Sequence, residues 1–214
     1  MLTLNVFIGV DSRQPVAFQV LAHSIYTRCS VPVAITPLWR DSLPVKRSGL
    51  TEFTYTRYLV PWLSKYQGIS IFLDADMLVL SDLYELYREM PLSADVGVVK
   101  NREKFEWASM MVFNNERCKS LTPQFIEDPA SKPMVFKWTD NIHELPSEWN
   151  HCVGYDVPRE TAKLVHFTQG IPCFPETENC EYAQEWIDEY KQANSTVTWN
   201  EIMGNSVHKA RMGL

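Results

Sequence analysis

Short apolar runs alternate with longer amphipathic stretches in the first half of the chain. Residues 4–10 and 33–36 are mostly apolar runs of the length that predicts buried strands. Between them, residues 14–28 carry apolar side chains at helical spacing along one side, which predicts a helix. A second helix is expected over residues 51–60, and Pro61 should end or kink it. This alternation of strands and helices is typical of a doubly wound parallel sheet.

The most informative run is residues 69–76, which follow Gly68 and end in two aspartates separated by one residue. Side chains two positions apart on an extended strand point the same way, so Asp74 and Asp76 should aim both carboxylates at one point. That point lies beyond the carboxyl end of the strand, where open α/β sheets bind ligands. Two carboxylates converging there favour a divalent cation, and a cation there favours a phosphate-bearing ligand. The D-x-D pattern is common by itself, and its position at the end of a buried strand gives it weight.

The second half of the chain alternates less regularly. A helix with an N-cap should begin at residues 81–83, and a polar helix with one apolar side should span residues 181–192. Residues 119–151 are rich in proline and polar residues, which predicts long loops, and residues 201–214 are expected to be a tail or a linker. Further strands are expected over residues 95–100, 110–114 and 163–167.

Composition narrows the functional classes. With 214 residues, the chain has the length of one domain, or of one domain with a small appendage. Its net charge of −6 argues against a nucleic acid as the main partner. No signal peptide or transmembrane-length apolar stretch is recognised, so any membrane association would be peripheral. The five scattered cysteines contain no C-x-x-C pair, which is typical of reduced thiols and indicates a cytoplasmic protein.

Four blocks along the chain resemble the ordered signatures of one enzyme family. They are Phe7–Asp11, Thr54–Pro61, Phe72–Asp76 and His166–Pro172. Together they resemble the GT-A glycosyltransferases, most closely those of family 8, over residues 4 to about 175. The resemblance implies an α/β fold of the GT-A type, with a Rossmann-like, mostly parallel sheet flanked by helices, in a single domain over residues 1–200. The compact size is also similar to that of the N-terminal glycosyltransferase domains of chlorovirus capsid-glycan proteins, which would place a viral protein in the host cytoplasm.

The resemblance implies an activity and its partners. The reaction would move a hexosyl or deoxyhexosyl residue from a UDP-sugar donor to a glycan or another hydroxyl acceptor, with retention of anomeric configuration. The cofactor would be Mn²⁺ or Mg²⁺, and an imidazole beside carboxylates shifts the choice toward Mn²⁺. No nucleic-acid partner and no transmembrane segment are expected, and further catalytic domains would lie C-terminal to this one.

The resemblance also assigns roles to particular residues. The metal ligands would be Asp74, Asp76 and His166. Asp140, in the stretch from Trp138 to Asn141, matches the position of a family group beside the reacting carbon and is the catalytic candidate. The donor would be bound by residues that lie in or between the four blocks. These are Gly9, Val10, Asp11, Arg57, Ala75, Ser109 and Gly170.

The chain departs from the family after His166. There the family places a lysine that steadies the leaving diphosphate, whereas this chain has no lysine between Gln169 and Cys173. A non-catalytic sugar-nucleotide-binding module is therefore an open alternative. A phosphatase of the haloacid dehalogenase type is another, with Asp74 as its nucleophile and Asp76 as its general acid. That class also needs a later lysine and a downstream acidic pair, and no Asp-Asp or Gly-Asp pair follows residue 82.

Each candidate also has an ordinary structural role that would explain it. Asp140 would be a loop aspartate, and Asp11 would cap the helix that follows it. His166 would be a core histidine at a strand end. Arg57 would lie on a solvated helix face or pair with an acidic residue, Glu52 or Asp82. Two other histidines are expected on surface loops, His143 and His151.

Overall fold

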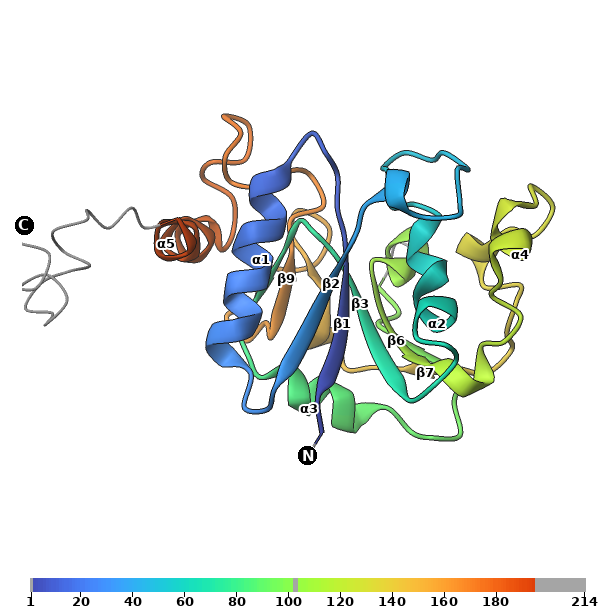
Figure 1. Ribbon diagram of the computed structural model, residues 1–214. Coiled ribbons are helices and arrows are strands. Elements are labelled where there is room, and N and C mark those ends of the chain that lie inside the picture. The colour runs from blue at the N-terminus through green and yellow to red at the C-terminus, as the bar shows by residue number, and fades with distance from the viewer. Residues whose placement is uncertain (1, 102–103, 195–214) are drawn as a thin grey trace, which may run out of the picture.

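A six-stranded sheet forms the centre of the molecule (Figure 1). The computed structural model describes residues 2–101 and 104–194, and its main sheet has the strand order β2-β1-β3-β6-β5-β7. β1 is parallel to β2 and β3, β6 is antiparallel to β3 and β5, and β7 is parallel to β5. All strands except β6 therefore run the same way, which confirms the expected mostly parallel α/β sheet. The strands are β1 (Leu4–Gly9), β2 (Val33–Leu38), β3 (Ile69–Asp74), β5 (Val96–Val98), β6 (Met110–Asn114) and β7 (Ile142–Glu144).

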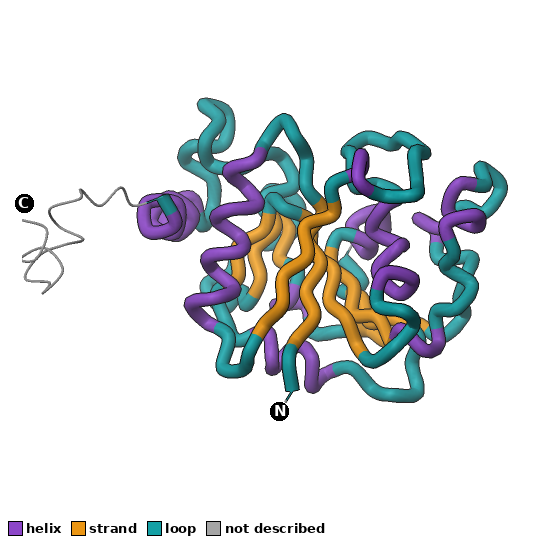
Figure 2. The backbone as a smooth tube through the Cα atoms, viewed as in Figure 1, coloured by secondary structure: helices purple, strands orange, loops and turns teal. Residues whose placement is uncertain are grey.

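Helices cover both faces of this sheet (Figure 2). Helix α1 packs on one face, whereas α2 and α4 pack on the other. Helix α5 lies against α1 on its outer side, near the end of the described chain. None of the helices that the structure describes is long and apolar enough to cross a membrane. The helices are α1 (Pro15–Arg28), α2 (Val60–Leu63), α3 (Leu83–Glu89), α4 (Pro123–Glu127) and α5 (Ala183–Ala193).

Strand β3 is buried on both faces, which is why its sequence reads as a continuous apolar run. Ile71 and Leu73 pack in the hydrophobic cluster that contains α1. Phe72 packs in the cluster on the opposite face, around α2. Side chains alternate along a strand, so Asp74 leaves the end of β3 on the same face as Phe72.

A second sheet of three strands begins at the turn after β3, in the order β4-β9-β8. Strand β9 is antiparallel to β4 and parallel to β8. Helix α1 packs over β4, where the Val79 N–H donates a hydrogen bond to the Ser24 hydroxyl at 3.1 Å. The small sheet therefore brings two late strands to the carboxyl end of β3. Its strands are β4 (Met77–Val79), β8 (His151–Cys152) and β9 (Leu164–His166).

The helix predicted over residues 51–60 is wrong. Thr56–Leu59 forms a 3-10 turn, and α2 begins only at Val60. Pro61 lies in the first turn of α2, where its missing N–H leaves no helical hydrogen bond unmade, so it starts this helix rather than ending one.

Two other predicted boundaries differ from the structure. The aspartate strand ends at Asp74, and residues 75–76 form a turn that leads into β4. Residues 119–151 are not loop throughout, because they contain α4 and β7. The expected tail at residues 201–214 lies outside the described residues.

Candidate metal centre

The turn between β3 and β4 carries the two aspartates to the late strand β9. In the register of β4 and β9, Met77 lies opposite His166. The Phe167 N–H donates to the Asp76 carbonyl at 2.9 Å, which fixes the turn to the end of β9. His166 is thus held beside Asp76 by backbone pairing between segments that are distant in the sequence.

Asp74, Asp76 and His166 form a group of side chains that we call the aspartate site. One donor atom from each lies within 4.8 Å of the other two, and Nε2 of His166 is 3.4 Å from Oδ1 of Asp76. Donor atoms around one Mn²⁺ or Mg²⁺ lie about 3–4.4 Å apart, because each bond is about 2.0–2.2 Å long. Small side-chain movements would therefore bring all three onto one ion.

Two oxygen atoms of the aspartate site lack the hydrogen bonds that buried oxygens normally accept. Oδ1 of Asp74 and Oδ1 of Asp76 are both buried and receive no hydrogen bond from the residues that the structure describes. Carboxylate oxygens with an imidazole nitrogen suit a divalent cation of the Mn²⁺ or Mg²⁺ type. The residues present therefore fit the expected metal.

The carboxylates converge for a different reason from the one that the sequence predicted. The prediction placed Asp74 and Asp76 on one continuous strand with the same orientation, and this is wrong because the strand ends at Asp74. Asp74 leaves β3 on the face of α2, whereas Asp76 is turned toward β9. The turn and the β4–β9 pairing bring the two side chains together.

Arg57 holds Asp74 in place. Its Nη2 atom lies 3.2 Å from Oδ1 of Asp74, and its Nη1 atom donates to the Ala108 carbonyl at 2.7 Å. Arg57 is 8% exposed, and its Nε atom donates to the Phe53 carbonyl at 3.3 Å. The solvated position and the pairing with Glu52 or Asp82 are therefore both wrong for Arg57, whose described role is to orient Asp74.

The charges of the site are not balanced by the protein alone. Burial raises the pKa of Asp74 to about 7, and the negative charges of Asp76 and Glu106 add to this effect, while Arg57 opposes it. Burial by itself would lower the pKa of His166, but the Asp76 carboxylate outweighs it and raises that pKa well above its usual value. The aspartate site thus attracts positive charge, which a proton or a metal ion can supply.

The first strand end forms the rim of a small pocket next to the aspartate site. Residues from three segments line this pocket of about 60 Å³: Asp11, Arg13, Gln14, Ala17, Thr51, Phe53, Ala75 and Asp76. A Cβ atom on Gly9 would lie 2.5 Å from the Phe53 ring, so only glycine fits there. Val10, the next residue, is fully buried.

Asp11 does not cap helix α1, contrary to the structural alternative raised by the sequence. Its carboxylate accepts hydrogen bonds from the Arg13 backbone N–H at 3.0 Å and from Nε of Arg13 at 2.8 Å. The residue before the helix is Gln14, and its side chain makes no capping bond. Asp11 therefore positions the Arg13 guanidinium at the pocket rim.

Ser109 and Gly170 both have structural partners in the protein. The Asp74 N–H donates to the Ser109 carbonyl at 2.9 Å, and the buried Ser109 hydroxyl donates to the Glu106 carbonyl at 2.6 Å. Gly170 has φ +123°, a conformation that side-chain-bearing residues rarely adopt, in the turn after β9. Ser109 thus supports the backbone of Asp74 at the end of β3.

The structure does not bring Asp140 to this site. Across the main sheet, Ile142 of β7 is in register with Val96, which is in register with Phe113, which is in register with Ser70 of β3. Asp140 precedes Ile142, so it lies near the end of the sheet where β3 begins. Asp74 lies at the opposite end, where β3 finishes. Asp140 is exposed, as the loop alternative expects, and the sequence-based choice of this residue as the catalytic group is not supported by its position.

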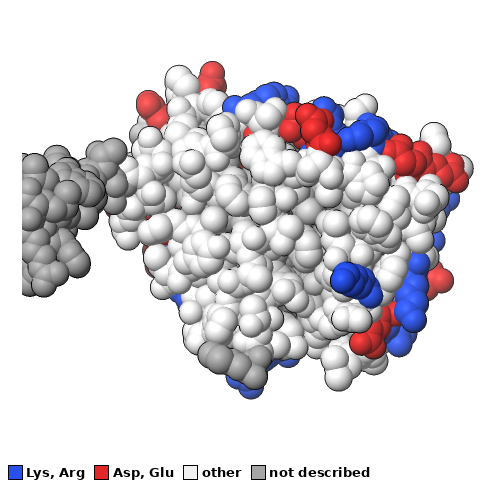
Figure 3. Space-filling model, viewed as in Figure 1, with Lys and Arg blue, Asp and Glu red and all other residues white. Residues whose placement is uncertain are grey.

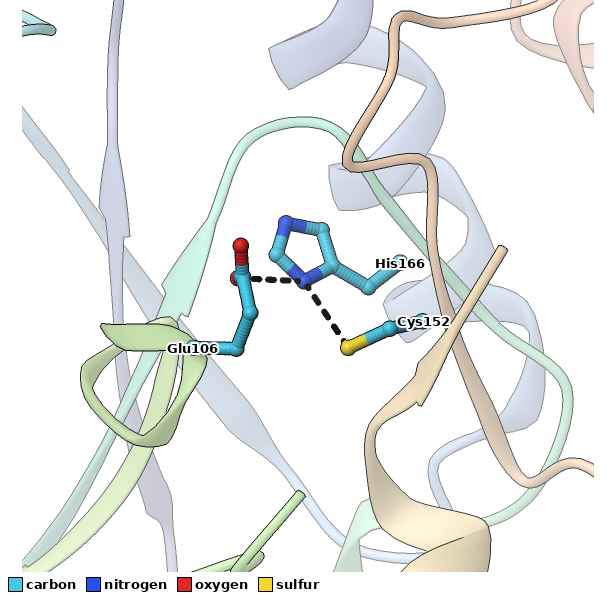
Figure 4. Close-up of side chains that lie close together, drawn as sticks. All are labelled: Glu106, Cys152 and His166. Carbon is cyan, nitrogen blue, oxygen red and sulfur yellow. Dashed lines mark hydrogen bonds and ion pairs between the residues drawn. The ribbon is translucent and has the colours of Figure 1, made fainter. Parts of the chain in front are cut away.

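Two residues of the site were missed by the sequence reasoning. Oε2 of Glu106 lies 3.4 Å from Nδ1 of His166, and Sγ of Cys152 lies 3.8 Å from the same nitrogen (Figure 4). Cys152 is placed by β8, where it is in register with His166. Glu106 comes from the 3-10 helix Lys104–Ala108, and neither residue belongs to a recognisable motif, so only the folded structure reveals them.

The two other histidines have different environments. His151 is fully buried, and its Nε2 atom lies 2.9 Å from Oε2 of Glu181, so its expected position on a surface loop is wrong. It lies on β8, one residue before Cys152, and its side chain packs edge-on against Tyr182. His143 is half-buried on β7.

Comparison with solved structures shows which proteins share this fold. The bifunctional glycosyltransferase WbbM superimposes with a TM-score of 0.68 and 16% identity, over 98% of this chain and 52% of that one. The galactosyltransferase LgtC superimposes with a TM-score of 0.62 and 11% identity, over 92% of this chain and 98% of that one. A glycosyltransferase involved in glycosylation of the major capsid of PBCV-1 is more distant, with a TM-score of 0.51 and 9% identity over 90% of this chain and 99% of that one. The chain spans about half the length of WbbM, and these likenesses show the fold alone.

Comparison of sequences identifies a relative with a much higher identity. No known family model matches the chain. Protein CDI of Arabidopsis thaliana is 32% identical over 227 aligned residues, which cover 89% of this chain and 87% of the plant protein. The chain therefore belongs to the family of Protein CDI.

Proposed function

We propose that this protein is a metal-dependent glycosyltransferase that moves a hexosyl or deoxyhexosyl residue from a UDP-sugar to a hydroxyl group of a glycan or another acceptor, with retention. The observation that carries the proposal is the aspartate site itself. Its two aspartates each present a buried oxygen without a hydrogen bond from the described residues, next to His166. The site lies at the carboxyl edge of a sheet whose fold is shared with solved structures named as glycosyltransferases.

Asp74, Asp76 and His166 would hold Mn²⁺ or Mg²⁺. When bound, such an ion neutralises charge that develops on a leaving diphosphate. Arg57 keeps the Asp74 carboxylate in one orientation, so little reorganisation is needed when a ligand arrives. Pairing of β4 with β9 does the same for His166.

The pocket beside the aspartate site is the proposed nucleotide end of the donor site. Asp11 and Ala75 line it, and Gly9 and Val10 immediately precede Asp11 in the chain and are donor contacts in this proposal. Arg13 stands at its rim with a side chain that is 65% exposed. It is the cation on this side of the site that could approach a diphosphate in place of the lysine that the chain lacks after His166.

Other donor contacts expected from the family resemblance are weaker candidates. The Ser109 hydroxyl donates to one protein group and accepts from Asn150 at 2.9 Å, and the Arg57 guanidinium is held by protein oxygens. Gly170 follows the late strand, close to Phe174. Direct donor contacts by these residues remain proposals, and the position of Asp140 argues against a catalytic role.

The phosphatase alternative has less support from the geometry. Its nucleophile would be Asp74, whose carboxylate is buried and paired with Arg57. A nucleophile of that class must reach a phosphorus atom, and this pairing holds the carboxylate away from solvent. A non-catalytic binding module remains the second candidate, because a lysine is absent between Gln169 and Cys173.

A thermal-shift panel of nucleoside diphosphate sugars, with and without Mn²⁺, tests the proposal. A bound donor stabilises the native state by RT ln(1 + [L]/Kd), so the correct UDP-sugar should raise the melting temperature only with Mn²⁺. Incubation with that donor should then release UDP, by transfer or by slow hydrolysis. Binding without any UDP release would favour the non-catalytic module, and release of phosphate from sugar phosphates would favour the phosphatase.

Location and further domains belong to the same proposal. All five cysteines are free thiols, which fits a reducing compartment such as the cytoplasm. Fluorescence microscopy of a tagged protein would check this location. Further catalytic domains C-terminal to this one would be found by sequencing the complete transcript.

A further inference from the structure

The His166 ring has donor groups on both of its sides. Its Nε2 atom faces Asp76 of the aspartate site. Its Nδ1 atom faces Glu106 and Cys152, and Figure 4 shows both side chains converging on this nitrogen while the other ring nitrogen points away from them. We call Glu106, Cys152 and Nδ1 of His166 the thiol site.

The spacing of the thiol site matches a small tetrahedral cation. Nδ1 lies 3.4 Å from Oε2 of Glu106 and 3.8 Å from Sγ of Cys152, and all three donor atoms lie within 4.8 Å of one another. In a tetrahedral Zn²⁺ site with bonds of about 2.0 Å to nitrogen or oxygen and about 2.3 Å to sulfur, neighbouring donors are about 3.3–3.6 Å apart. The two distances to Nδ1 therefore need to close by only a few tenths of an ångström, while Oε2 of Glu106 and Sγ of Cys152, which lie within 4.8 Å of each other, would draw closer together as well.

The three side chains are buried. Glu106 is 7% exposed, Cys152 1% and His166 3%. The Glu106 carboxylate is ion-paired with His166, whose Nδ1 atom lies 3.4 Å from Oε2. A buried carboxylate is costly unless a cation balances it.

One amide donor faces the sulfur, while burial raises the pKa of the Cys152 thiol, so a thiolate there would need a cation beside it. Nδ2 of Asn101 lies 3.4 Å from Sγ of Cys152 and donates toward it. The same amide donates to the Asn150 carbonyl at 2.7 Å, which fixes its orientation. Such donors around a ligating atom are the usual supports of a metal site.

We propose that the thiol site binds a divalent cation of the Zn²⁺ class, separately from the cation of the aspartate site. Sulfur, nitrogen and carboxylate oxygen form a zinc donor set, whereas the aspartate site offers the harder set that Mn²⁺ or Mg²⁺ prefers. Binding forms one bond each to Sγ, Nδ1 and Oε2, and releases to solvent the thiol proton and any proton on the coordinating nitrogen.

The two sites share one imidazole, which makes them compete. A neutral imidazole has one lone pair, so it ligates through Nδ1 or through Nε2 but not through both. Zn²⁺ at the thiol site would take His166 away from the aspartate site. This competition rests on the proposed function, whereas the existence of the thiol site does not.

Cobalt spectroscopy tests the thiol site without any assay of activity. Co²⁺ replaces Zn²⁺ in such sites, and a bond from Co²⁺ to a thiolate gives a near-ultraviolet charge-transfer band that oxygen and nitrogen ligands do not give. We expect this band in the wild-type chain, saturating at one Co²⁺ per chain and disappearing when Zn²⁺ is added. Cys152→Ser should lose the band, and Cys173→Ser, which changes an exposed thiol, should keep it.

Folding of the variants is checked by circular dichroism, and Glu106→Gln provides a second variant that keeps every sulfur atom. Glu106→Gln should weaken Co²⁺ binding by more than about tenfold while leaving the band detectable at high Co²⁺, since one ligand is lost. Absence of the band from the wild-type chain, or an unchanged band in Cys152→Ser, would overturn the proposal. Either result would leave Mn²⁺-dependent UDP binding untouched, so a failure here is distinct from a failure of the proposed function.

Discussion

Two buried carboxylates of this protein, Glu189 and Asp74, have opposite environments. Glu189 on α5 is 2% exposed; its Oε2 atom lies 2.7 Å from Nη2 of Arg28, and its Oε1 atom bonds the His23 ring. Asp74 at the end of β3 is 7% exposed, and its Oδ1 atom accepts no hydrogen bond from the described residues. The first carboxylate ties α5 to α1, whereas the second is left with capacity to bind something more.

The pKa values follow from this difference. Burial tends to raise the pKa of Glu189, but Arg28 and His23 outweigh it and hold that pKa below its usual value. For Asp74, burial prevails over the opposing charges of Arg57 and His166 and raises the pKa to about 7. Burial of a carboxylate is therefore not by itself a sign of function; incomplete pairing of a buried carboxylate is the more informative sign.

The largest effect on activity is expected from Asp76→Asn, which removes a ligand charge and keeps the side-chain shape. Transfer should fall more than about a hundredfold, since even outer-shell partners of metal ligands typically cost 10–100-fold. The melting temperature should hardly change, because the Asp76 side chain is 30% exposed and supports no core packing. Turnover with Mn²⁺ and thermal unfolding measure the two quantities. Asp140→Asn, at the other end of the sheet, is the matched control and should keep normal turnover. Near-normal turnover of Asp76→Asn would contradict a role of the aspartate site in the reaction.

The comparison predicts the reverse pattern for Glu189→Gln. The free energy of unfolding should fall by about 1–3 kcal/mol, because Arg28 and His23 lose their shared anion. Mn²⁺ affinity should be unchanged in the folded molecules. Urea unfolding and Mn²⁺ titration check both parts. A loss of Mn²⁺ affinity without a loss of stability would contradict the assignment of Glu189 to stability and of Asp74 to metal binding.

His166→Ala should weaken Mn²⁺ binding by more than about tenfold if the imidazole is a ligand. Protons compete with the metal for this nitrogen, so binding should also weaken as the pH falls, and added Mn²⁺ should restore it. Isothermal titration of Mn²⁺ in the presence of UDP measures the change. If folded His166→Ala binds Mn²⁺ as tightly as the wild type, His166 is a core histidine and the aspartates are the only protein ligands among the described residues.

The contribution of Glu189 to stability should depend on pH in a defined direction. The pKa of Glu189 is lowered in the folded state, so the ionised form stabilises the fold above the unfolded-state pKa of about 4.3. That contribution should disappear as the pH falls below about 4. The difference in unfolding free energy between wild type and Glu189→Gln should therefore be largest near neutral pH and shrink in acid. A difference that grows in acid would contradict this assignment.

The smallest effect is expected from Arg13→Gln at the pocket rim. Arg13 is exposed and paired with Asp11, so it can approach a diphosphate only by leaving that pair. UDP affinity should fall several-fold with stability unchanged, and the loss should shrink at high salt because exposed charges are screened. Arg40→Gln, at a half-buried arginine outside the pocket lining, is the control. Equal UDP affinity in wild type and Arg13→Gln would contradict the proposal that Arg13 contacts the diphosphate.

Local patterns predicted the parts of the fold that local interactions determine. Helix α1 and strands β1, β6 and β9 have nearly the predicted bounds, because each has a clear apolar period or run. The segment around Thr56–Leu59 was misassigned because its aromatic side chains bury in a 3-10 turn instead of along a helix face. Periodicity does not distinguish these two cases over so short a segment.

The candidate site was predictable only in part, for the same reason. The D-x-D pattern lies in one segment, so it could be found in the sequence. Glu106 and Cys152 meet His166 through a 3-10 helix and a parallel strand pair, which no local pattern announces. The expected position of Asp140 beside the reacting carbon fails for the same reason. The end of the sheet at which Asp140 lies depends on the direction of β7, which the local sequence does not reveal.

The most direct test of the central claim is a calorimetric titration of UDP into the wild-type chain with Mn²⁺ and again with EDTA. Asp74 and Asp76 each have a buried oxygen that accepts no hydrogen bond from the described residues, which predicts that UDP binds with Mn²⁺ and that binding is lost in EDTA. The same titration with Glu189→Gln should match the wild type in both conditions. Equal UDP affinity with Mn²⁺ and with EDTA would contradict the claim that these carboxylates bind the nucleotide through a metal ion.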